Sequence, residues 1–145
     1  MAQSLSGALD NYKVLIEEFC GSAVAQIHRY ETRALPSDIV SYVLPVEPFM
    51  EPWTGSIGKN YRSGLGFIVH IPSANLETAQ QSVELILHCL GRMWNDPRSL
   101  SLSGAVDAME EPETDVEKDL EEENRESTRI TCSVVATIDL GEDDG

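Results

Sequence analysis

The strongest constraint on the fold is a strict two-residue alternation near the end of the chain. From Ile130 to Leu140 every even position is apolar, whereas the odd positions between them are mostly polar. Successive side chains of a strand point to opposite faces, so this period predicts one long strand with one buried face. A strand of this kind needs a second layer against its apolar face.

A helix between positions 73 and 94 is predicted to supply that layer. Ser73 or Asn75 serves as the expected N-cap, and the helix should stop at Asn95-Asp96-Pro97, because proline disfavours helical geometry in the residue before it. One continuous apolar stripe indicates which side packs on the sheet. Its members are Leu76, Ala79, Val83, Ile86, Leu87, Leu90, Met93 and Trp94.

An earlier amphipathic helix begins near Ser6, with an apolar stripe at three- and four-residue steps. Gly21 is its expected end, unless this glycine is tolerated and the stripe continues through Ile27. The alternation from Ala23 to Tyr30 favours a strand instead, and both alternatives stay open. The stripe consists of Leu9, Tyr12, Ile16, Phe19 and Cys20.

Three further segments have strand patterns: 39–46, 65–71 and 100–108. Because prolines cannot donate ladder hydrogen bonds, Pro45, Pro48 and Pro52 predict that the first of these ends at a sheet edge or leaves the sheet. A polar connector is expected from Glu51 to Ser63.

Residues 110–126 form an acidic segment, in which nine carboxylates precede Asn124 and only Lys118 opposes them. Such a run repels itself and cannot form a core, so a flexible loop is expected. Val116 and Leu120 would allow a short helix when a partner is present. The acidic tail 141–145 is expected to be mobile.

The predicted fold class is therefore α+β in one domain over residues 1–145, since this length suits one core. Two amphipathic helices should pack on one face of a mostly antiparallel sheet of four or five strands, with the long acidic loop before the last strand. Cys20, Cys89 and Cys132 are expected to be reduced and buried, because each lies within an apolar pattern.

The net charge of −15 argues against a surface that grips nucleic acid, since affinity for phosphates comes mainly from lysine and arginine. An acidic surface can still act near DNA by repelling it, although simple solubility is the plainer interpretation. The first residues lack the pattern of a secretory signal, and no stretch reaches the length of a membrane span. We therefore expect synthesis in a cytoplasm and no membrane partner.

No spacing typical of a catalytic or metal site is found. The loop Gly55–Asn60 departs from the phosphate-binding pattern and precedes a strand. His28, His88 and the cysteines lack zinc spacing, and the acidic segment lacks the glycine of a calcium loop. We predict no enzyme activity, no catalytic residues, no metal and no cofactor.

Two aromatic residues, Trp53 and Tyr61, lie in the predicted connector, outside any core pattern. Exposed aromatic side chains often anchor protein contacts, so both are candidate interface residues. The alternative is that Trp53 folds back over the sheet edge. In the acidic segment, the candidate residues for a pore lining or a partner contact are Glu117, Asp119, Glu121, Glu122 and Glu123.

The order of elements resembles the tail terminator proteins of long-tailed bacteriophages. The resemblance is carried by Phe67–Ile71 leading into the helix that ends at Trp94, by Leu100–Val106, and by Thr131–Leu140. It implies a small α/β domain that assembles into a hexameric ring on the tail tube, with no catalytic residues to transfer. The long acidic insertion departs from compact members.

The resemblance implies a virion protein, made in the host cytoplasm, that ends tube growth and joins the tail to the head. Its expected partners are copies of itself, the tail tube protein and the head connector or neck proteins, with DNA passing unbound. One alternative is another neck adaptor or head-tail stopper. Another is an acidic adaptor that imitates nucleic acid or binds a basic partner.

Overall fold

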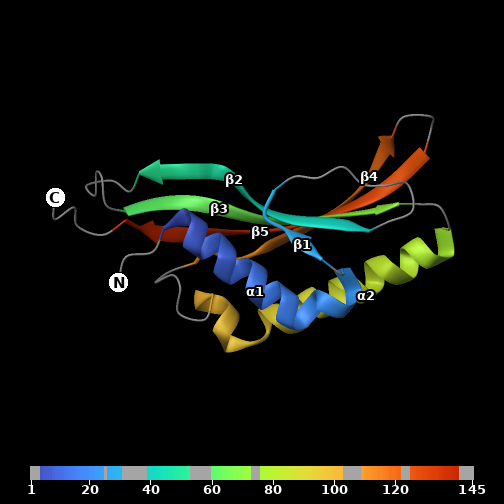
Figure 1. Ribbon diagram of the computed structural model, residues 1–145, viewed down its shortest axis with the longest axis horizontal. Helices are drawn as coiled ribbons and strands as arrows, with labels where there is room; N and C mark the ends of the chain where they lie inside the picture. The colour runs from blue at the N-terminus through green and yellow to red at the C-terminus, as the bar shows by residue number, and fades with distance from the viewer. Residues whose placement is uncertain are drawn as a thin grey trace.

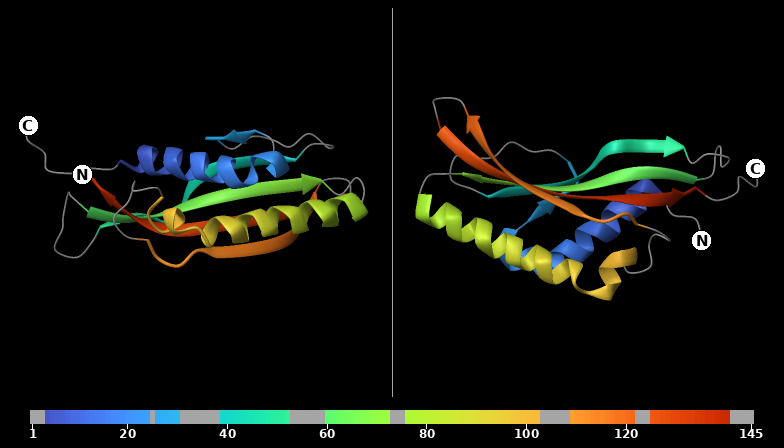
Figure 2. Two further views of the ribbon diagram at one scale, coloured as in Figure 1. Left: turned by 90° about the horizontal axis from the view of Figure 1, so that it is seen from below. Right: turned by 180° about the vertical axis from the view of Figure 1, so that it is seen from behind.

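The computed structural model describes residues 4–24, 26–30, 39–52, 60–72, 76–102, 109–121 and 125–140. Within these ranges two α-helices and one 3-10 helix lie on the same side of a five-stranded sheet (Figure 1, Figure 2). The predicted α+β class, with both helices on one face of a mostly antiparallel sheet, is confirmed. The elements are α1 (Leu5–Val24), β1 (Ile27–His28), β2 (Val40–Pro52), β3 (Asn60–Pro72), α2 (Leu76–Trp94), η1 (Pro97–Ser101), β4 (Glu113–Glu121) and β5 (Arg125–Asp139).

The strand order is β1-β2-β3-β5-β4, and the short β1 is the one strand of the described sheet that runs parallel to its neighbour. The alternation that predicted β5 is confirmed from Ile130 to Ile138, where the even residues are buried and share a face with Leu65, Phe67 and Val69 of β3. Leu140, the last residue of the predicted alternation, is exposed and follows the end of β5. Both helices cover this face and pack on each other. Burying an aliphatic or aromatic side chain of this size contributes roughly 1.5–3 kcal/mol, so this face supplies the core.

Tyr12 joins the two helices to the sheet at the centre of the core. Its buried hydroxyl donates a hydrogen bond to the backbone oxygen of Cys132, at 2.8 Å. Its ring lies 6.2 Å from that of Trp94, whose indole nitrogen is 3.1 Å from the Cys132 sulfur. The hydroxyl is therefore satisfied despite its burial, as buried polar groups require.

α1 starts one residue before its expected beginning and continues through Gly21 to Val24. The hydroxyl of Ser4 accepts a hydrogen bond from the backbone nitrogen of Gly7 at the N-terminus. A glycine inside a helix costs about 0.5–1 kcal/mol relative to alanine. Burial of Cys20 and Val24 in the last turn outweighs that cost. Of the alternative strand over residues 23–30, only the short β1 forms among the described residues.

The prediction of a strand over 100–108 is wrong where the structure describes it. η1 occupies Pro97–Ser101 instead, and residues 103–108 lie outside the described residues. The Asp96 side chain caps η1 by accepting a hydrogen bond from the Arg98 backbone nitrogen, with proline at the first helical position. Local capping therefore prevails over the alternating pattern, which leaves Leu100 exposed.

The prediction of a flexible loop is wrong for most of the acidic segment, because residues 113–121 form β4 and pair with β5. The short helix that Val116 and Leu120 would allow when a partner is present stays a prediction. An extended strand places same-face neighbours about 7 Å apart and leaves exposed carboxylates solvated, which weakens their repulsion. Pairing also covers an edge of β5 that would otherwise be open. Residues 122–124 and the tail 141–145 lie outside the described residues.

The connector expected from Glu51 to Ser63 is shorter than predicted, because β2 extends to Pro52 and β3 begins at Asn60. The prolines of β2 lie at an edge, as predicted. β1 pairs only with Ser41 and Tyr42, and the β2–β3 register shifts between Val46 and Glu51. The far half of β2 therefore has no described strand on its outer side.

Candidate interaction surfaces

The two predicted interface aromatics have different outcomes. Trp53 lies outside the described residues. Tyr61 does not lie in a loop: it is part of β3, opposite Pro52 on one side and Ile138 on the other. Its side chain is half-buried and packs against the core. Tyr61 therefore helps to hold the sheet together and is a poor candidate for a free contact residue.

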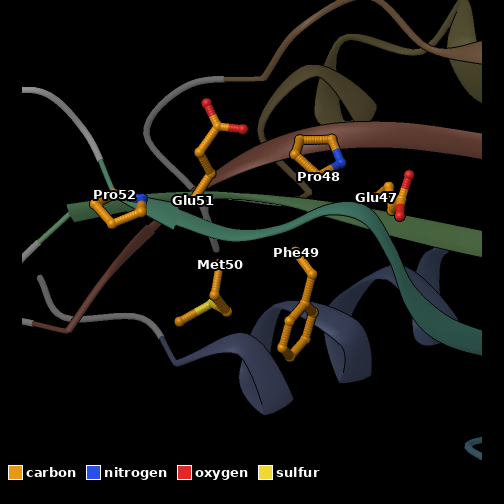
Figure 3. Close-up of a pocket in the computed structure, with 6 residues that line it drawn as sticks. All are labelled: Glu47, Pro48, Phe49, Met50, Glu51 and Pro52. Carbon is orange, nitrogen blue, oxygen red and sulfur yellow. The ribbon is translucent and has the colours of Figure 1, made fainter.

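A different aromatic residue is exposed nearby, at the segment Glu47–Pro52, which we call the β2 tip. These six residues line an open hollow of about 730 Å³ (Figure 3). Phe49 is 62% exposed, whereas its neighbour Met50 is half-buried against the core. Phe49 and Met50 project from the same side of the strand, toward the side where α1 lies (Figure 3). The register shift and the positive φ of Met50, 46°, account for this break in alternation.

Two glycines of β3 make room for β2 where it leads into the tip. A Cβ atom on Gly64 would lie 2.6 Å from the backbone oxygen of Val46 and 2.7 Å from that of Glu47. A Cβ atom on Gly66 would lie 2.6 Å from a methyl carbon of Val46. Real Cβ atoms do not approach so closely, so the path of β2 depends on these two glycines.

Arg62 fixes the other side of the β2 tip. Its guanidinium lies 3.2 Å from the carboxylate of Glu51 and 2.5 Å from that of Glu110. Hydrogen bonding to Glu110, followed by the attraction of both carboxylates, raises the pKa of Arg62 above its ordinary value. In addition, the hydroxyl of Ser63 accepts a hydrogen bond from the Met50 backbone nitrogen. The tip is therefore anchored through Met50 and Glu51, the two residues that follow Phe49.

The second surface is the outer edge of β4, the segment Glu113–Glu121, which we call the β4 edge. β4 is the last strand of the sheet, and no described strand lies on its outer side. Every second residue of β4 lies on the sheet face that the helices leave open. Three of these residues are exposed carboxylates: Glu113, Asp115 and Glu117. Glu117 also lies 2.5 Å from the guanidinium of Arg129 on β5.

The remaining candidates of the acidic segment are placed in part. Asp119 and Glu121 continue the register of β4, opposite Ser127 and Arg125. Glu122 and Glu123 lie outside the described residues. The structure therefore places three of the five predicted acidic residues along one strand, in a fixed row that a flexible loop would not provide.

The two surfaces lie far apart on the sheet. The end of the β2 tip pairs with Tyr61, at the start of β3. β4 pairs with the first half of β5, which itself lies opposite the final half of β3. The β2 tip and the β4 edge therefore occupy opposite edges and opposite ends (Figure 1).

Of the side chains considered for metal binding, the cysteines lie near one another and the two histidines lie elsewhere. Cys20, Cys89 and Cys132 are free and buried, and burial, followed by the proximity of Cys89, raises the pKa of Cys20 to about 12. His28 packs against Tyr30, whereas His88 is exposed on α2. In the part of the chain that the structure describes, no three such residues group closely enough to hold a metal ion. Neither described helix has the length and apolar character needed to cross a membrane.

No protein-family model matches this chain, and no curated protein matches it. Function is therefore inferred from the fold, the β2 tip and the β4 edge.

Proposed function

We propose that this chain is a structural subunit of a long-tailed bacteriophage. Copies of it assemble into a ring at the head-proximal end of the tail, where the ring ends tube growth and joins the tail to the head connector. The observation that carries this proposal is the exposed Phe49 in the hollow of the β2 tip, on an anchored edge of the sheet. The resemblance of the element order to tail terminators supplies the biological setting.

The mechanism is steric and electrostatic, with no catalytic step and no cofactor. A subunit of this kind must hold its shape, and the buried Tyr12, Phe67 and Leu90 belong to one continuous core beneath both helices. A rigid two-layer domain can present a tip to its neighbour and still offer other surfaces to the tube and the connector. Closed symmetric assembly satisfies these contacts without open-ended growth.

The β2 tip is the proposed contact between neighbouring copies. An aromatic side chain can bury about 150–250 Å² and Phe49 is 62% exposed, so covering the exposed part at about 25 cal/mol per Å² contributes about 2–4 kcal/mol per contact before the entropy of association is subtracted. Aromatic side chains that fill a pocket at an interface typically contribute most of its binding energy. Phe49 fits this role because the strand that presents it is fixed by Arg62 and by the two glycines.

The charge of the chain suits a passage for DNA. Six copies at −15 each would carry a formal charge of −90. An acidic surface repels phosphates, so a duplex passing through the ring would not adhere to it.

A second candidate, from a different class, is an acidic adaptor that binds a basic protein without forming a ring. The row of carboxylates on the β4 edge favours it. A third role, as another neck adaptor or head-tail stopper, shares the ring and differs in its place within the particle. Ring formation separates the adaptor from both assembly roles, and position in the particle separates the two assembly roles from each other.

Native mass spectrometry of the purified chain over a range of concentrations tests the proposal. We expect a closed oligomer for the unchanged chain and dissociation toward monomer for Phe49→Ser. Val14→Ser is the matched control, because Val14 is equally exposed but lies on α1 and does not line the hollow. Circular dichroism should show that both variants remain folded. A chain that stays monomeric at every concentration, or a Phe49→Ser variant that assembles normally, contradicts the proposal.

A further inference from the structure

β4 has no described strand on its outer side, which leaves the backbone groups of that side as candidates for pairing with another chain. Outward-facing backbone groups of an edge strand can pair with any extended segment, and native proteins restrict that pairing with charge. β4 is nine residues long, enough for a full strand-to-strand ladder, and β5 holds only its inner side. The identity of the partner therefore depends on the side chains along the edge.

A second β4 does not fit this edge. Two copies paired antiparallel about Glu117 would place the carboxylates of one directly opposite those of the other, at about 5 Å. Shifting the register by one residue would set the acidic row against Thr114, Val116 and Lys118, and would leave the two helical layers on opposite faces of the joined sheet. Like charges opposite each other destabilise a sheet, and one lysine does not neutralise the row.

The opposite edge of a second copy does not fit either. β2 contains three prolines, two glutamates and no lysine or arginine. Several lysine and arginine side chains elsewhere in the chain already form ion pairs within it. These pairs are Lys13 with Glu17, Arg29 with Asp10, Arg62 with Glu51 and Glu110, Arg98 with Glu18 and Asp96, and Arg129 with Glu117.

We infer that the β4 edge binds an extended basic segment of a different protein by strand addition. On the open face the segment presents lysine or arginine beside Glu113, Asp115 and Glu117. On the helix-covered face it presents apolar or β-branched residues beside Val116, which is 46% exposed. The carboxylates of β4 that disfavour pairing with a second copy favour pairing with a basic segment.

This inference rests on the proposed function, because it assigns the β4 edge to a joining partner and leaves the β2 tip to contacts between copies. It adds the chemical class of that partner. The resulting six-stranded sheet would pass from one protein into the other, which would transmit force along backbone hydrogen bonds without requiring a large apolar interface.

The probe is a labelled nine-residue peptide of alternating lysine and valine, matched in length to β4. A peptide of the same composition with its lysines contiguous controls for charge alone. We expect the alternating peptide to bind more tightly and to slow amide hydrogen exchange within residues 113–121. Equal binding of the two peptides, or unchanged exchange in β4, would overturn the inference.

Two variants with the same change of charge, one on β4 and one on α2, test whether the peptide binds at the β4 edge. Asp115→Lys should weaken binding of the alternating peptide by about tenfold, because it replaces attraction by repulsion at the centre of the ladder. Glu84→Lys makes the same change of charge on the exposed side of α2 and should leave the affinity within about twofold. Equal loss in both variants would overturn the inference.

Native mass spectrometry of the same samples separates this inference from the proposed function. Closed oligomers that do not bind the peptide would refute strand addition and would still agree with the proposed ring. Monomers that bind the peptide at β4 would support strand addition and refute the ring. Closed oligomers of Asp115→Lys that have lost peptide binding are the result expected if both hold.

Discussion

The β2 tip depends on two glycines, and a set of substitutions measures that dependence. In Gly64→Ala the added Cβ meets two backbone oxygens, at 2.6 and 2.7 Å, and neither can move without displacing β2. Overpacking of this kind typically destabilises a protein by about 1–3 kcal/mol. Alanine also lowers the conformational entropy of the unfolded chain, which stabilises the folded state by about 0.4–1 kcal/mol. We therefore expect Gly64→Ala to lower the free energy of unfolding by about 1–2 kcal/mol.

Gly66→Ala differs because the closest atom is a methyl carbon of Val46, at 2.6 Å, and the nearest backbone oxygen is at 3.6 Å. Val46→Ala removes that methyl carbon. The double variant should recover about 1 kcal/mol relative to the sum of the single changes, which is a coupling energy typical of residues in contact. In Gly64→Ala the backbone clash remains, so the same second change should recover much less.

Urea denaturation followed by tryptophan fluorescence measures the unchanged chain, the three single variants and the two double variants, with the m-value as a check on two-state behaviour. A Gly64→Ala variant as stable as the unchanged chain would refute the close approach of β2. Equal recovery of both glycine variants by Val46→Ala would refute the assignment of one clash to backbone and the other to a side chain.

Three further predictions concern the helices and the core. Gly21→Ala should raise the free energy of unfolding by about 0.5–1 kcal/mol in thermal melts, since nothing lies within 4 Å of the added Cβ; a loss would contradict the open surroundings of Gly21. Tyr12→Phe should cost about 1 kcal/mol, because the Cys132 carbonyl loses a buried donor, and an unchanged urea midpoint would show that this hydrogen bond contributes nothing. Folding raises the pKa of Cys20 from 9.0 to about 12, so between these values the folded chain keeps a proton that the unfolded chain releases. The stability that Cys20 contributes is therefore complete below pH 9 and is lost as the pH rises toward 12. The fall in stability over that range should be shallower in Cys20→Ala, and identical slopes in both proteins would argue against the raised pKa.

The parts of the fold that the sequence predicts are those with a strong local period. The stripe of α2 and the alternation of β5 each require one buried face, and the two faces meet in the structure. The edge position of β2 followed from Pro45, Pro48 and Pro52, because a missing donor is a local property.

The features that the sequence did not predict depend on non-local pairing or on local capping. β4 looks unstructured from its charge, and only the ladder to β5 and the Arg129 contact with Glu117 make it a strand. η1 forms because Asp96 caps it, against the alternating pattern that follows. Tyr61 was assigned to a connector because the pairing of Glu51 with Arg62 cannot be read from either segment alone.

The sequence carries a signal for the exposure of Phe49. This residue stands between Pro48 and Pro52, in a segment where the alternation of β2 cannot continue. An apolar side chain at such a break has no assured place in the core. The structure places it 62% exposed, next to the half-buried Met50.

Electron microscopy of phage particles assembled without this chain tests the central claim most directly. If the chain ends tube growth and joins the tail to the head, its removal should leave tails of uncontrolled length and heads that carry no tail. Adding back the Phe49→Ser variant should restore neither feature, whereas Val14→Ser should restore both. Particles of normal tail length, with heads and tails joined in the absence of the chain, would contradict the account.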